Sequence, residues 1–412
     1  MSGQRVVIVN DFSVARGGAT ALALLAAELI AATGREVVYL SGDAGGAERL
    51  SRAGVPNPGF GAQSLLARGR ASAFVSGLWN GAAARFLSDW IAREGRPDDV
   101  YHLHGWSQIF SPAVFSALSG VRERLVVHAH DFFLACPNGA FWDYGGEAAC
   151  HRRPLSTACL AARCDRRSSA QKYWRAGRHA LRQGSFRFGA AGPEILLIHA
   201  GMLPFFERAG FDPQCLTVLP NPVAEAAEPP VDAASKQGFV FVGRLDPEKG
   251  ALTAARAAAE AGVALRLVGE GPERDAIAAL IPPPEMTGWL DRQAVTAEIR
   301  RARALVMPSR YAEPFGLVAV EALRQGVPVV LPSHALIAAV CAATGAGAVY
   351  DASDPGALSA TLRHLATDDA AIATMAANAP AAAAEMATTP SAWCDGLLAA
   401  YARTERLPVA AQ

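Results

Sequence analysis

Short apolar runs and longer helical stretches alternate from the start of the chain. The runs at 6–9 and 36–40 predict two buried strands. Between them, the Ala- and Leu-rich stretch 21–33 predicts a helix, and Gly34 is a typical residue to end it. The first part of the chain therefore begins as a strand, a helix and a second strand.

Two further β-rich runs, 99–105 and 125–131, end in polar residues. Continuous apolar strands separated by helices are typical of a parallel sheet that is covered on both faces. Ligands bind such sheets at the carboxyl ends of the strands. Asp11, His104 and the neighbours His130 and Asp131 would all lie at that edge, so they are candidate site residues. A single histidine at a strand end is more often structural, and we expect His104 and Asp131 only on the acceptor side of a site.

The alternation stops and then starts again in the second half. Residues 224–237 are rich in Ala, Pro and acidic side chains, which is typical of a linker. Four new strands are predicted beyond it, at 238–245, 263–271, 304–309 and 327–332. We therefore expect an α/β protein with two Rossmann-like domains, 1–223 and 224–390, and a terminal helical segment, 391–412.

Composition supports a folded protein without a strongly charged partner. Of the 412 residues, 51% are hydrophobic and 18% are charged, and the formal net charge is zero. These values argue against disorder, and the zero net charge gives no indication of nucleic acid binding. The N-terminal run is too short and too polar for a signal peptide, and no stretch has the roughly 18 apolar residues of a membrane span. We expect a cytoplasmic protein.

The stretch 304–323 carries the most informative chemistry. Pro308 and Pro314 exclude a helix before Gly316, and good helix formers follow. Glu313 is thus expected on a strand-to-helix loop, and Glu321 inside the helix. The backbone amides at the helix start, those of residues 315–317, could bind a phosphate between these two carboxylates. A loop glutamate and a solvated helix face remain the alternative.

Two other strand ends carry polar loops. Gly243–Arg244 follows the strand at 239–242, and Lys249 comes just before the next helix, so both cations could reach one anion. After the following strand, Gly269, Glu270 and Gly271 would let a ligand approach the backbone. Each motif alone could be an ordinary turn, but three such loops in one domain indicate a nucleotide site.

Taken together, these motifs resemble glycosyltransferase family 4, a large GT-B family of retaining nucleotide-sugar transferases. The similarity rests on GRLDPEKG, GEGPE, TGWLDRQAV and MPSRYAEPFGLVAVEAL in the second domain. It is thinner in the first domain, where RGGAT, HAHD and LPNPV carry it. The resemblance implies two Rossmann-like domains that face a central cleft and a terminal helix that crosses back to the first domain.

The resemblance also implies residue roles. Arg244 and Lys249 match the cations on the donor diphosphate, Glu313 the carboxylate on the transferred sugar, and Glu321 the one on the ribose. His130 matches a histidine beside the reacting sugar. The expected catalytic residues are therefore Arg244, Lys249, Glu313 and His130, and the expected donor-binding residues are Gly17, Gly18, Gly243, Glu270, Phe315, Gly316, Leu317 and Glu321.

The implied mechanism needs no catalytic metal and no buried nucleophile, because cations and helix amides stabilise the leaving diphosphate. The donor would be linked to UDP or GDP, and the acceptor would be a glycan, a lipid-linked sugar or a small molecule.

Pro222 stands where the family usually has Gly, and AAGPE at 190–194 replaces a serine-containing turn, which weakens the match on the acceptor side. A GT-B nucleotide-sugar epimerase and a non-catalytic sugar-nucleotide-binding partner remain alternatives. The chain lacks the GxGxxG pattern of a dehydrogenase.

An insert at 132–187 interrupts the first domain. It holds four of the seven cysteines, Cys136, Cys150, Cys159 and Cys164, which could form a structural zinc site although they lack close CxxC pairs. Ten cations lie between 152 and 187. They could bind an anionic acceptor, or the anionic lipids of the inner face of the membrane. A solvated basic helix is the alternative.

Overall fold

The fold was analysed on a computed structural model, which describes residues 4–15, 17–189 and 192–404. The chain divides into two units. The first unit comprises Met1–Pro220 and Pro390–Gln412, and the second comprises Asn221–Thr389. The sequence-based domain boundary at 223/224 therefore lies three residues after the structural one, and the terminal segment is part of the first unit.

The first unit is built on a parallel sheet of six strands in the order β2-β1-β3-β4-β7-β8. Its first four strands in sequence order are entirely buried, as continuous apolar runs predict for a sheet covered on both faces, whereas the edge strand β8 is half-buried. They span Val6–Asn10 (β1), Val37–Ser41 (β2), Val100–Leu103 (β3), Leu125–Ala129 (β4), Glu194–Leu197 (β7) and Leu216–Val218 (β8). A short hairpin, Trp142–Asp143 (β5) and Ala148–Ala149 (β6), lies in the insert.

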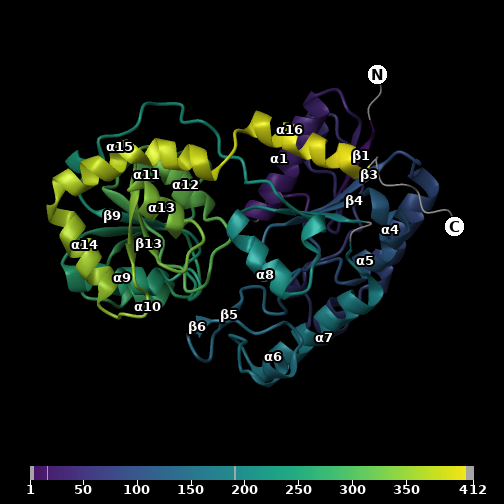
Figure 1. Cartoon of the computed structure of the whole chain (residues 1–412), viewed down its shortest axis with the longest axis horizontal. Coiled ribbons are helices and arrows are strands. Elements are labelled where there is room, and N and C mark those ends of the chain that lie inside the picture. The colour runs from purple at the N-terminus through teal and green to yellow at the C-terminus, as the bar shows by residue number, and fades with distance from the viewer. Residues whose placement is uncertain (1–3, 16, 190–191, 405–412) are drawn as a thin grey trace. The chain divides into compact units, whose positions relative to one another are not determined.

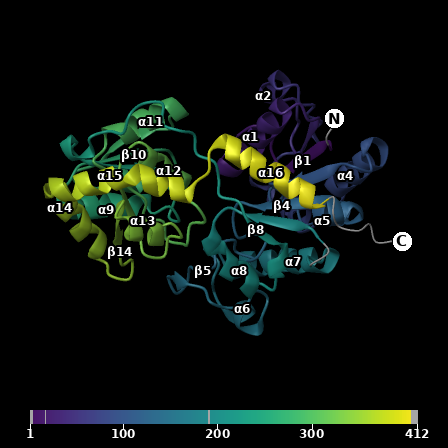
Figure 2. The ribbon, with the colours of Figure 1, turned by 45° about the horizontal axis from the view of Figure 1, so that its top comes forward.

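Helices cover both faces of this sheet (Figures 1 and 2). Two long helices, α1 and α16, pack together on one face although they lie at opposite ends of the sequence. The helices α4, α5 and α7 lie on the other face. The bounds are Gly18–Ala32 (α1), Glu48–Arg52 (α2), Arg70–Leu78 (α3), Gly81–Glu94 (α4), Ala113–Ala117 (α5), Thr157–Ala161 (α6), Ser169–Ser185 (α7), Leu203–Arg208 (α8) and Pro390–Thr404 (α16).

The second unit holds another parallel six-stranded sheet, in the order β11-β10-β9-β12-β13-β14. This is the order of a Rossmann fold, in which the strand order reverses between the first and fourth strands. The strands span Phe239–Val242 (β9), Leu265–Val268 (β10), Glu285–Gly288 (β11), Ala304–Val306 (β12), Val329–Pro332 (β13) and Gly347–Tyr350 (β14).

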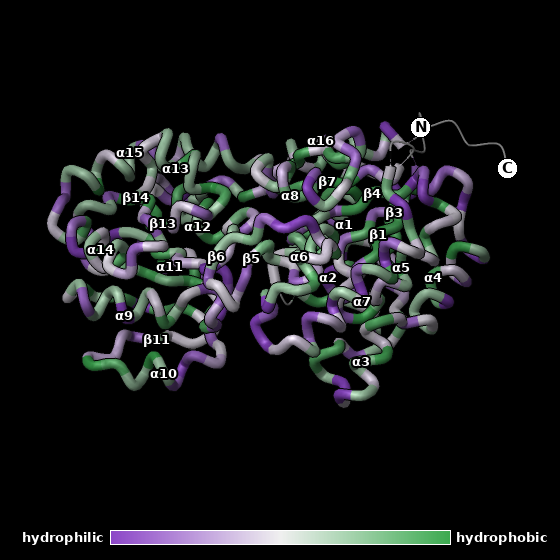
Figure 3. Tube along the Cα trace, turned by 60° about the horizontal axis from the view of Figure 1, so that its bottom comes forward, coloured by the Kyte–Doolittle hydropathy of each residue, from purple (hydrophilic) through white to green (hydrophobic). Residues whose placement is uncertain are grey.

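Seven helices connect and cover this second sheet in the part of the chain that the structure describes. They span Ala251–Ala261 (α9), Arg274–Ala278 (α10), Arg292–Arg301 (α11), Leu317–Arg324 (α12), Ala338–Thr344 (α13), Ala357–Thr367 (α14) and Asp369–Met386 (α15). Many small alanines of α9 are fully buried against the sheet, which lets the helix pack closely. Figure 3 shows the hydrophobic stretches, in green, within each unit, and hydrophilic loops around them.

The terminal helix α16 buries Trp393, Leu397 and Tyr401 in the first unit. The expected terminal segment 391–412 is helical up to Thr404, and residues 405–412 lie outside the described residues. None of the helices in the described ranges has the length and apolar character needed to cross a bilayer.

Candidate active site

The candidate donor site of the second unit lies where its strand order reverses. The strands β9 and β12 are direct neighbours in the sheet, and the chain leaves them in opposite lateral directions. Gly243 and Arg244 follow β9, and the loop 307–316 follows β12. In open parallel sheets, this switch point is where ligands bind. The two most informative sequence motifs therefore meet at the expected place.

A lysine and a glutamate from these two loops form an ion pair. The Nζ of Lys249 contacts Oε1 of Glu313, and the hydroxyl of Ser309 donates to Oε2 of the same carboxylate. The side chains of Lys249 and Glu313 are 24% and 12% exposed, so the pair is largely enclosed but not fully buried. The ammonium also lies 5.8 Å from the ring centre of Tyr311. The structure thus joins two of the four expected catalytic residues.

Arg244 is held differently. Its guanidinium is 72% exposed and lies 2.8 Å from the carboxylate of Asp246, which is 8% exposed. The same carboxylate accepts the backbone N–H of Lys249 at 3.2 Å. Asp246 therefore fixes the turn that carries both cations, while the guanidinium of Arg244 stays accessible to an anion.

The helix α12 begins at Gly316, which has a left-handed backbone with φ of 69°. A side chain is strained in this conformation, and a Cβ at Gly316 would also lie 3.0 Å from Met307. The amides of Phe315, Gly316 and Leu317 accordingly stand at the start of the helix, where intrahelical acceptors are lacking. These amides and the positive end of the helix dipole favour an anion there.

Glu321 lies one turn further along α12. Its carboxylate is half-buried and faces the guanidinium of Arg292 at 3.4 Å. Burial raises the pKa of Glu321, and the charge of Arg292 partly offsets this shift. The carboxylate oxygens of Glu321 are the groups that a contact with ribose hydroxyls would use.

The loop that holds Glu270 is packed against the loop of Arg244. The backbone N–H of Leu245 donates to the carbonyl of Glu270 at 2.9 Å, and the Glu270 side chain is exposed. Gly269 has a φ of 139°, and a Cβ there would lie 2.0 Å from the carbonyl oxygen of Gly243. The glycines of this motif are therefore explained by contact between two loops, in addition to any contact with a ligand.

In the first unit, the loop after β1 leads through Gly17 to α1, which begins at Gly18. Arg16, part of the same sequence motif, lies outside the described residues. Asp11 does not offer its carboxylate to a ligand. It is buried and accepts three backbone N–H groups, from Gln108, Ile109 and Phe110, at 2.7 to 2.9 Å. The hypothesis of a functional Asp11 is therefore replaced by a structural role, in which Asp11 anchors the loop that follows β3.

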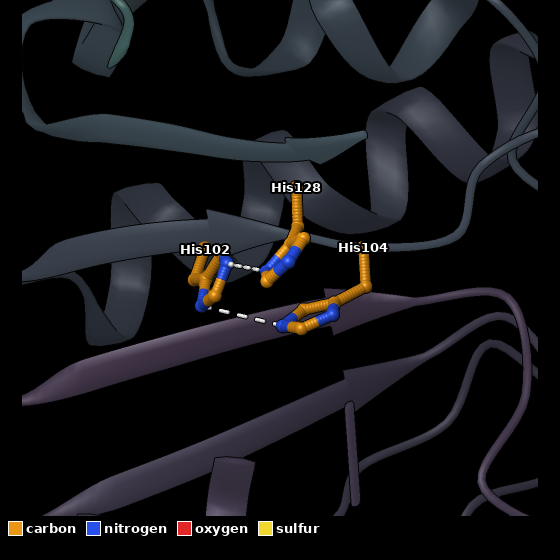
Figure 4. Close-up of side chains that lie close together, drawn as sticks. All are labelled: His102, His104 and His128. Carbon is orange, nitrogen blue, oxygen red and sulfur yellow. Dashed lines mark hydrogen bonds between the residues drawn. The ribbon is translucent and has the colours of Figure 1, made fainter. Parts of the chain in front are cut away.

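His104 and His130 come together at the ends of β3 and β4. The Nδ1 of His104 lies 2.8 Å from the Nε2 of His130. Asp131 next to it is exposed and accepts the N–H of Phe133 at 2.8 Å. His102 and His128, which lie two residues before His104 and His130, extend the group, and Figure 4 shows His102, His104 and His128. The structure therefore joins two expected site residues through a larger histidine cluster.

This cluster has the spacing of a metal-binding group. His102, His104 and His128 each offer one ring nitrogen, and these atoms lie within 4.8 Å of one another. In the described ranges, no other set of three His, Cys, Asp or Glu side chains meets that spacing. Burial lowers the pKa values of all three rings, that of His102 to about 3, so the imidazoles are neutral at physiological pH.

The four cysteines of the insert surround one pocket. Cys136, Cys150, Cys159 and Cys164 are all buried, unbridged and in its lining. Burial raises the pKa of the Cys136 thiol to about 12, and the thiol lies 3.1 Å from Oδ1 of Asn138. The side chains gather as a zinc site would require, but their sulfur atoms are not spaced closely enough to form a tetrahedral thiolate site without movement.

The basic insert is less exposed than its sequence suggests. Of the ten cations between 152 and 187, Lys172 and Arg182 on α7 are fully buried, and Arg175 and Arg178 are half-buried. Lys172 donates to the backbone carbonyls of Cys159, Leu160 and Ala162. The arginines stack on aromatic rings, with Arg178 only 4.8 Å from the ring centre of Trp174. The alternative of a solvated basic helix is therefore wrong for Lys172 and Arg182, and Arg175 and Arg178 are only partly solvated.

Several site residues had no separate role in the sequence-based prediction. Three of them each contact a predicted residue and lie inside the motifs that carried the resemblance. Ser309 contacts Glu313, Asp246 contacts Arg244, and Arg292 contacts Glu321. His102 and His128 lie two residues before His104 and His130 in the sequence, a spacing that puts both members of each pair on one face of a strand. Tyr401, on α16, carries no sequence signal of this kind.

Comparison with known proteins agrees with these observations. Residues 227–382 match the model of a family described as "Glycosyl transferases group 1". The chain is 28% identical over 266 residues to "Glycogen synthase" of Mycobacterium tuberculosis, covering 60% of this chain and 61% of the relative. It is 32% identical over 228 residues to "D-inositol 3-phosphate glycosyltransferase" of Segniliparus rotundus, covering 50% of each chain. In these comparisons, the chain spans between half and about three fifths of the curated relatives' lengths.

The structural comparisons cover almost the whole chain. Anabaena Alr3699/HepE, solved in complex with UDP and glucose, superimposes with a TM-score of 0.67 at 16% identity, over 97% of this chain and 100% of the other. The sucrose-phosphate synthase of Thermosynechococcus elongatus gives a TM-score of 0.70 at 17% identity, over 97% and 98%. These likenesses show the fold, and with the family match they confirm the expected resemblance and the expected α/β fold class with two Rossmann-like domains.

Proposed function

Because the second unit of this GT-B chain is a glycosyl transferases group 1 domain, we propose that the protein transfers a sugar from a nucleotide diphosphate to an acceptor. The observation that carries the proposal is the Lys249–Glu313–Ser309 group at the switch point between β9 and β12. A negatively charged sugar donor requires a cation and free backbone amides for its diphosphate and a carboxylate for the hydroxyls of its sugar. These groups are together in the second unit. The donor is proposed to be a UDP- or GDP-linked sugar, and transfer is proposed to retain the anomeric configuration.

The geometry supports separate roles for the polar groups. The diphosphate would be bound by Lys249, by the exposed guanidinium of Arg244 and by the amides at the start of α12. The carboxylate of Glu313 would accept hydroxyls of the transferred sugar, and that of Glu321 would accept ribose hydroxyls. Negative charge that develops on the leaving diphosphate would then be stabilised by fixed positive groups, without reorganisation of solvent.

The ion pair between Lys249 and Glu313 has a consequence for donor binding. The carboxylate holds the ammonium in position before the donor arrives, which reduces the side-chain entropy lost on binding. When the diphosphate binds, Lys249 gains a second anionic partner and Glu313 can turn to a sugar hydroxyl. Loss of either residue therefore removes a direct contact and also the orientation of the other residue.

The test begins with a panel of UDP, GDP and ADP sugars in a thermal-shift assay, followed by transfer assays with glycan, lipid-linked and small-molecule acceptors. Acceptor-dependent release of the nucleoside diphosphate supports transfer. Interconversion of the sugar without an acceptor would instead show an epimerase, and binding without turnover would show a non-catalytic partner. If no nucleotide sugar stabilises the protein, the proposal is refuted.

Variants connect the activity to this site. Lys249→Ala and Glu313→Gln are each expected to lower the transfer rate about 100-fold or more, since a lost electrostatic contact at a reacting centre costs about 3 kcal/mol. Lys236→Ala is the matched control, because Lys236 is the other lysine of the second unit, is half-buried and lies outside these loops. Equal activity of Lys249→Ala and Lys236→Ala would show that the donor site lies elsewhere.

Two finer expectations about the insert are also kept as proposals. We propose a structural zinc ion at the four clustered cysteines, because thiols are preferred zinc ligands and all four line one pocket. We also propose a peripheral contact with anionic lipid through the exposed cations of the insert, which include Arg153, Arg163, Arg166, Arg167 and Arg187.

A further inference from the structure

Three histidine rings and one tyrosine hydroxyl of the first unit come together from three elements of the fold. His102 lies on β3 and His104 directly after it. His128 lies on β4, and Tyr401 lies on α16. Figure 4 shows the three rings facing one another between the two strands. All four residues are 0 to 4% exposed, and polar groups buried this deeply need partners.

The contacts of the cluster meet at the Nδ1 atom of His102. The hydroxyl oxygen of Tyr401 lies 2.8 Å from this nitrogen, and the Nε2 of His104 lies 3.3 Å from it. On the other side of the ring, the Nε2 of His102 lies 3.3 Å from the Nδ1 of His128. One ring nitrogen of each histidine lies within 4.8 Å of the other two. Potential ligand atoms from β3, β4 and α16 therefore surround one small volume.

Hydrogen bonds alone do not satisfy these groups. A neutral imidazole has one N–H and one lone pair, so the Nδ1 of His102 can make one full hydrogen bond. If it accepts from Tyr401, the Nε2 of His104 is left without a full partner; if it donates to His104, the hydroxyl of Tyr401 has no acceptor among the described residues. The Nε2 of His128 is also buried and has no hydrogen-bond partner in the part of the chain that the structure describes. At least two buried polar groups thus remain unsatisfied, which is costly.

A metal ion would accept several of these lone pairs at once. Imidazole nitrogens are preferred ligands of Zn²⁺, which takes four ligands in a tetrahedral arrangement. At the usual Zn–N length of about 2.0–2.1 Å, two ligand atoms of a tetrahedral site lie about 3.3 Å apart. The Nδ1 of His102 and the Nε2 of His104 have this separation. The nitrogen of His128 lies within 4.8 Å of both, so a modest rotation of its ring would complete the set.

We propose that this cluster is a structural zinc site. Three ligands would be ring nitrogens of His102, His104 and His128. The fourth would be the hydroxyl oxygen of Tyr401. On binding, the hydroxyl of Tyr401 would release its proton to solvent, so that Zn²⁺ and one phenolate leave a net charge of +1 in the buried site. The site lies in the first unit, so the inference does not depend on the proposed donor site of the second unit.

A neighbouring histidine orients one of the proposed ligands. The Nδ1 of His104 lies 2.8 Å from the Nε2 of His130. When the N–H of His104 donates to this nitrogen, the ring is fixed and its Nε2 keeps a lone pair for the ion. Metal-bound histidines commonly use their second nitrogen in this way. The ring of His128 is held by packing, with ring centres 4.3 Å from His130 and 5.9 Å from Trp393 of α16.

The proposed ion would join the terminal helix to the sheet. Tyr401 is 299 positions from His102 in the sequence, and α16 packs on β4. A cross-link between such distant positions closes a long loop, and binding free energy that is available only in the folded state adds to the stability of the fold. Removal of the ion is therefore expected to lower the melting temperature of the first unit and to increase hydrogen exchange in α16.

The first test counts the metal. Elemental mass spectrometry of the whole protein is expected to find one equivalent of zinc that is lost in His102→Gln and in His128→Gln. The control His364→Gln, at an exposed site on α14, should keep it. An ion in the cysteine pocket is counted separately, because Cys159→Ser should leave the histidine-bound equivalent in place. Equal metal content in His102→Gln and His364→Gln would overturn the proposal.

The second test identifies the ligands by cobalt substitution. Chelator-treated Cys159→Ser protein, reloaded with Co²⁺, is expected to bind one equivalent with the intense visible absorption of a tetrahedral site and without thiolate charge-transfer bands. Adding Tyr401→Phe keeps the buried ring and removes the oxygen ligand. It should weaken Co²⁺ binding about 10- to 100-fold, as even the loss of an outer partner of a metal-bound histidine does, and change the visible spectrum.

Two outcomes of this second test would refute the site. One is a chelator-treated Cys159→Ser protein that binds no Co²⁺ although its melting temperature shows that it is folded. The other is an unchanged cobalt affinity and spectrum in the Tyr401→Phe variant, which would exclude the fourth ligand. Neither readout uses a nucleotide sugar. Failure of the donor assays would therefore leave the zinc site standing, and failure of the zinc site would leave the proposed function standing.

Discussion

Mild acid is expected to destabilise the first unit strongly, because its buried histidines must remain uncharged in the fold. Desolvation lowers the pKa of His102 to about 3 and those of His104 and His128 well below their ordinary value. In the unfolded chain, each ring titrates near 6.5. The unfolded state therefore binds more protons below that pH, and stability falls as the pH decreases from about 6.5 toward 3.

The magnitude follows from linkage. Between pH 7 and pH 5, each histidine that charges only in the unfolded state lowers the free energy of unfolding by about 2 kcal/mol. Three such rings together give about 6 kcal/mol, which is comparable with the total stability of an ordinary domain, roughly 5–15 kcal/mol. Burial also raises the pKa values of Asp11 and Asp131, that of Asp131 to about 6, which offsets part of this loss, whereas His130 and His179, whose pKa values burial lowers to about 3, add to it. We therefore expect the first unit to be near its unfolding transition at pH 5.

Tryptophan fluorescence is a suitable probe for this prediction. Of the seven tryptophans, only Trp289 lies in the second unit, and it is 75% exposed, so its emission changes little on unfolding. Urea unfolding at pH 7, 6 and 5 should show a steadily decreasing midpoint. The variant His128→Phe should have a shallower pH dependence by about one proton, whereas the control His364→Gln, at an exposed site on α14, should follow the wild type. A midpoint that does not change between pH 7 and pH 5 would refute the burial of neutral histidines.

Three further predictions concern other features of the molecule. Gly269→Ala should lower the free energy of unfolding of the second unit by about 1–3 kcal/mol, because its Cβ would clash with the carbonyl of Gly243, whereas Gly356→Ala should have little effect in the same calorimetric scan. If the cysteine pocket holds zinc, the purified protein should contain one equivalent by mass spectrometry and lose it in Cys159→Ser but not in Cys215→Ser; metal-free protein with four titratable thiols in the pocket would refute the site. Flotation with anionic vesicles at low salt should retain the wild type and release the triple variant Arg163→Glu, Arg166→Glu and Arg167→Glu, and equal behaviour of both would refute the lipid contact.

The sequence predicted most of the central strands because they are continuous apolar runs, but it missed β7 of the first sheet and two strands of the second sheet. β11 and β14 are the edge strands of that sheet, and they include exposed or half-buried residues such as Glu285 and Val349. A strand with only one neighbour and one covered face needs no continuous apolar run. Its sequence therefore cannot be distinguished from a loop by hydropathy.

The insert shows a different limit. Its arginines and its one lysine predicted a solvated basic surface, yet the face of α7 that carries Lys172 and Arg182 is buried. Long cationic side chains can bury their apolar stems and place their charged ends on backbone carbonyls or aromatic faces. Composition counts the charges but contains no information on which neighbours accept them, so the orientation of the helix could not be predicted.

The donor residues of the second unit and the histidines of the first unit show the same difference. The donor residues lie in motifs that follow directly on β9 and β12, and the rule that parallel strands end at one edge converts sequence order into proximity. The pairs His102–His104 and His128–His130 also follow a local rule, since residues two apart share a strand face. Tyr401, whose hydroxyl lies 2.8 Å from Nδ1 of His102, is 299 positions away in the sequence and is brought there because α16 packs on β4. Local motifs can therefore identify which polar groups gather at a strand end, but a partner such as Tyr401 comes from a tertiary contact that no local motif contains.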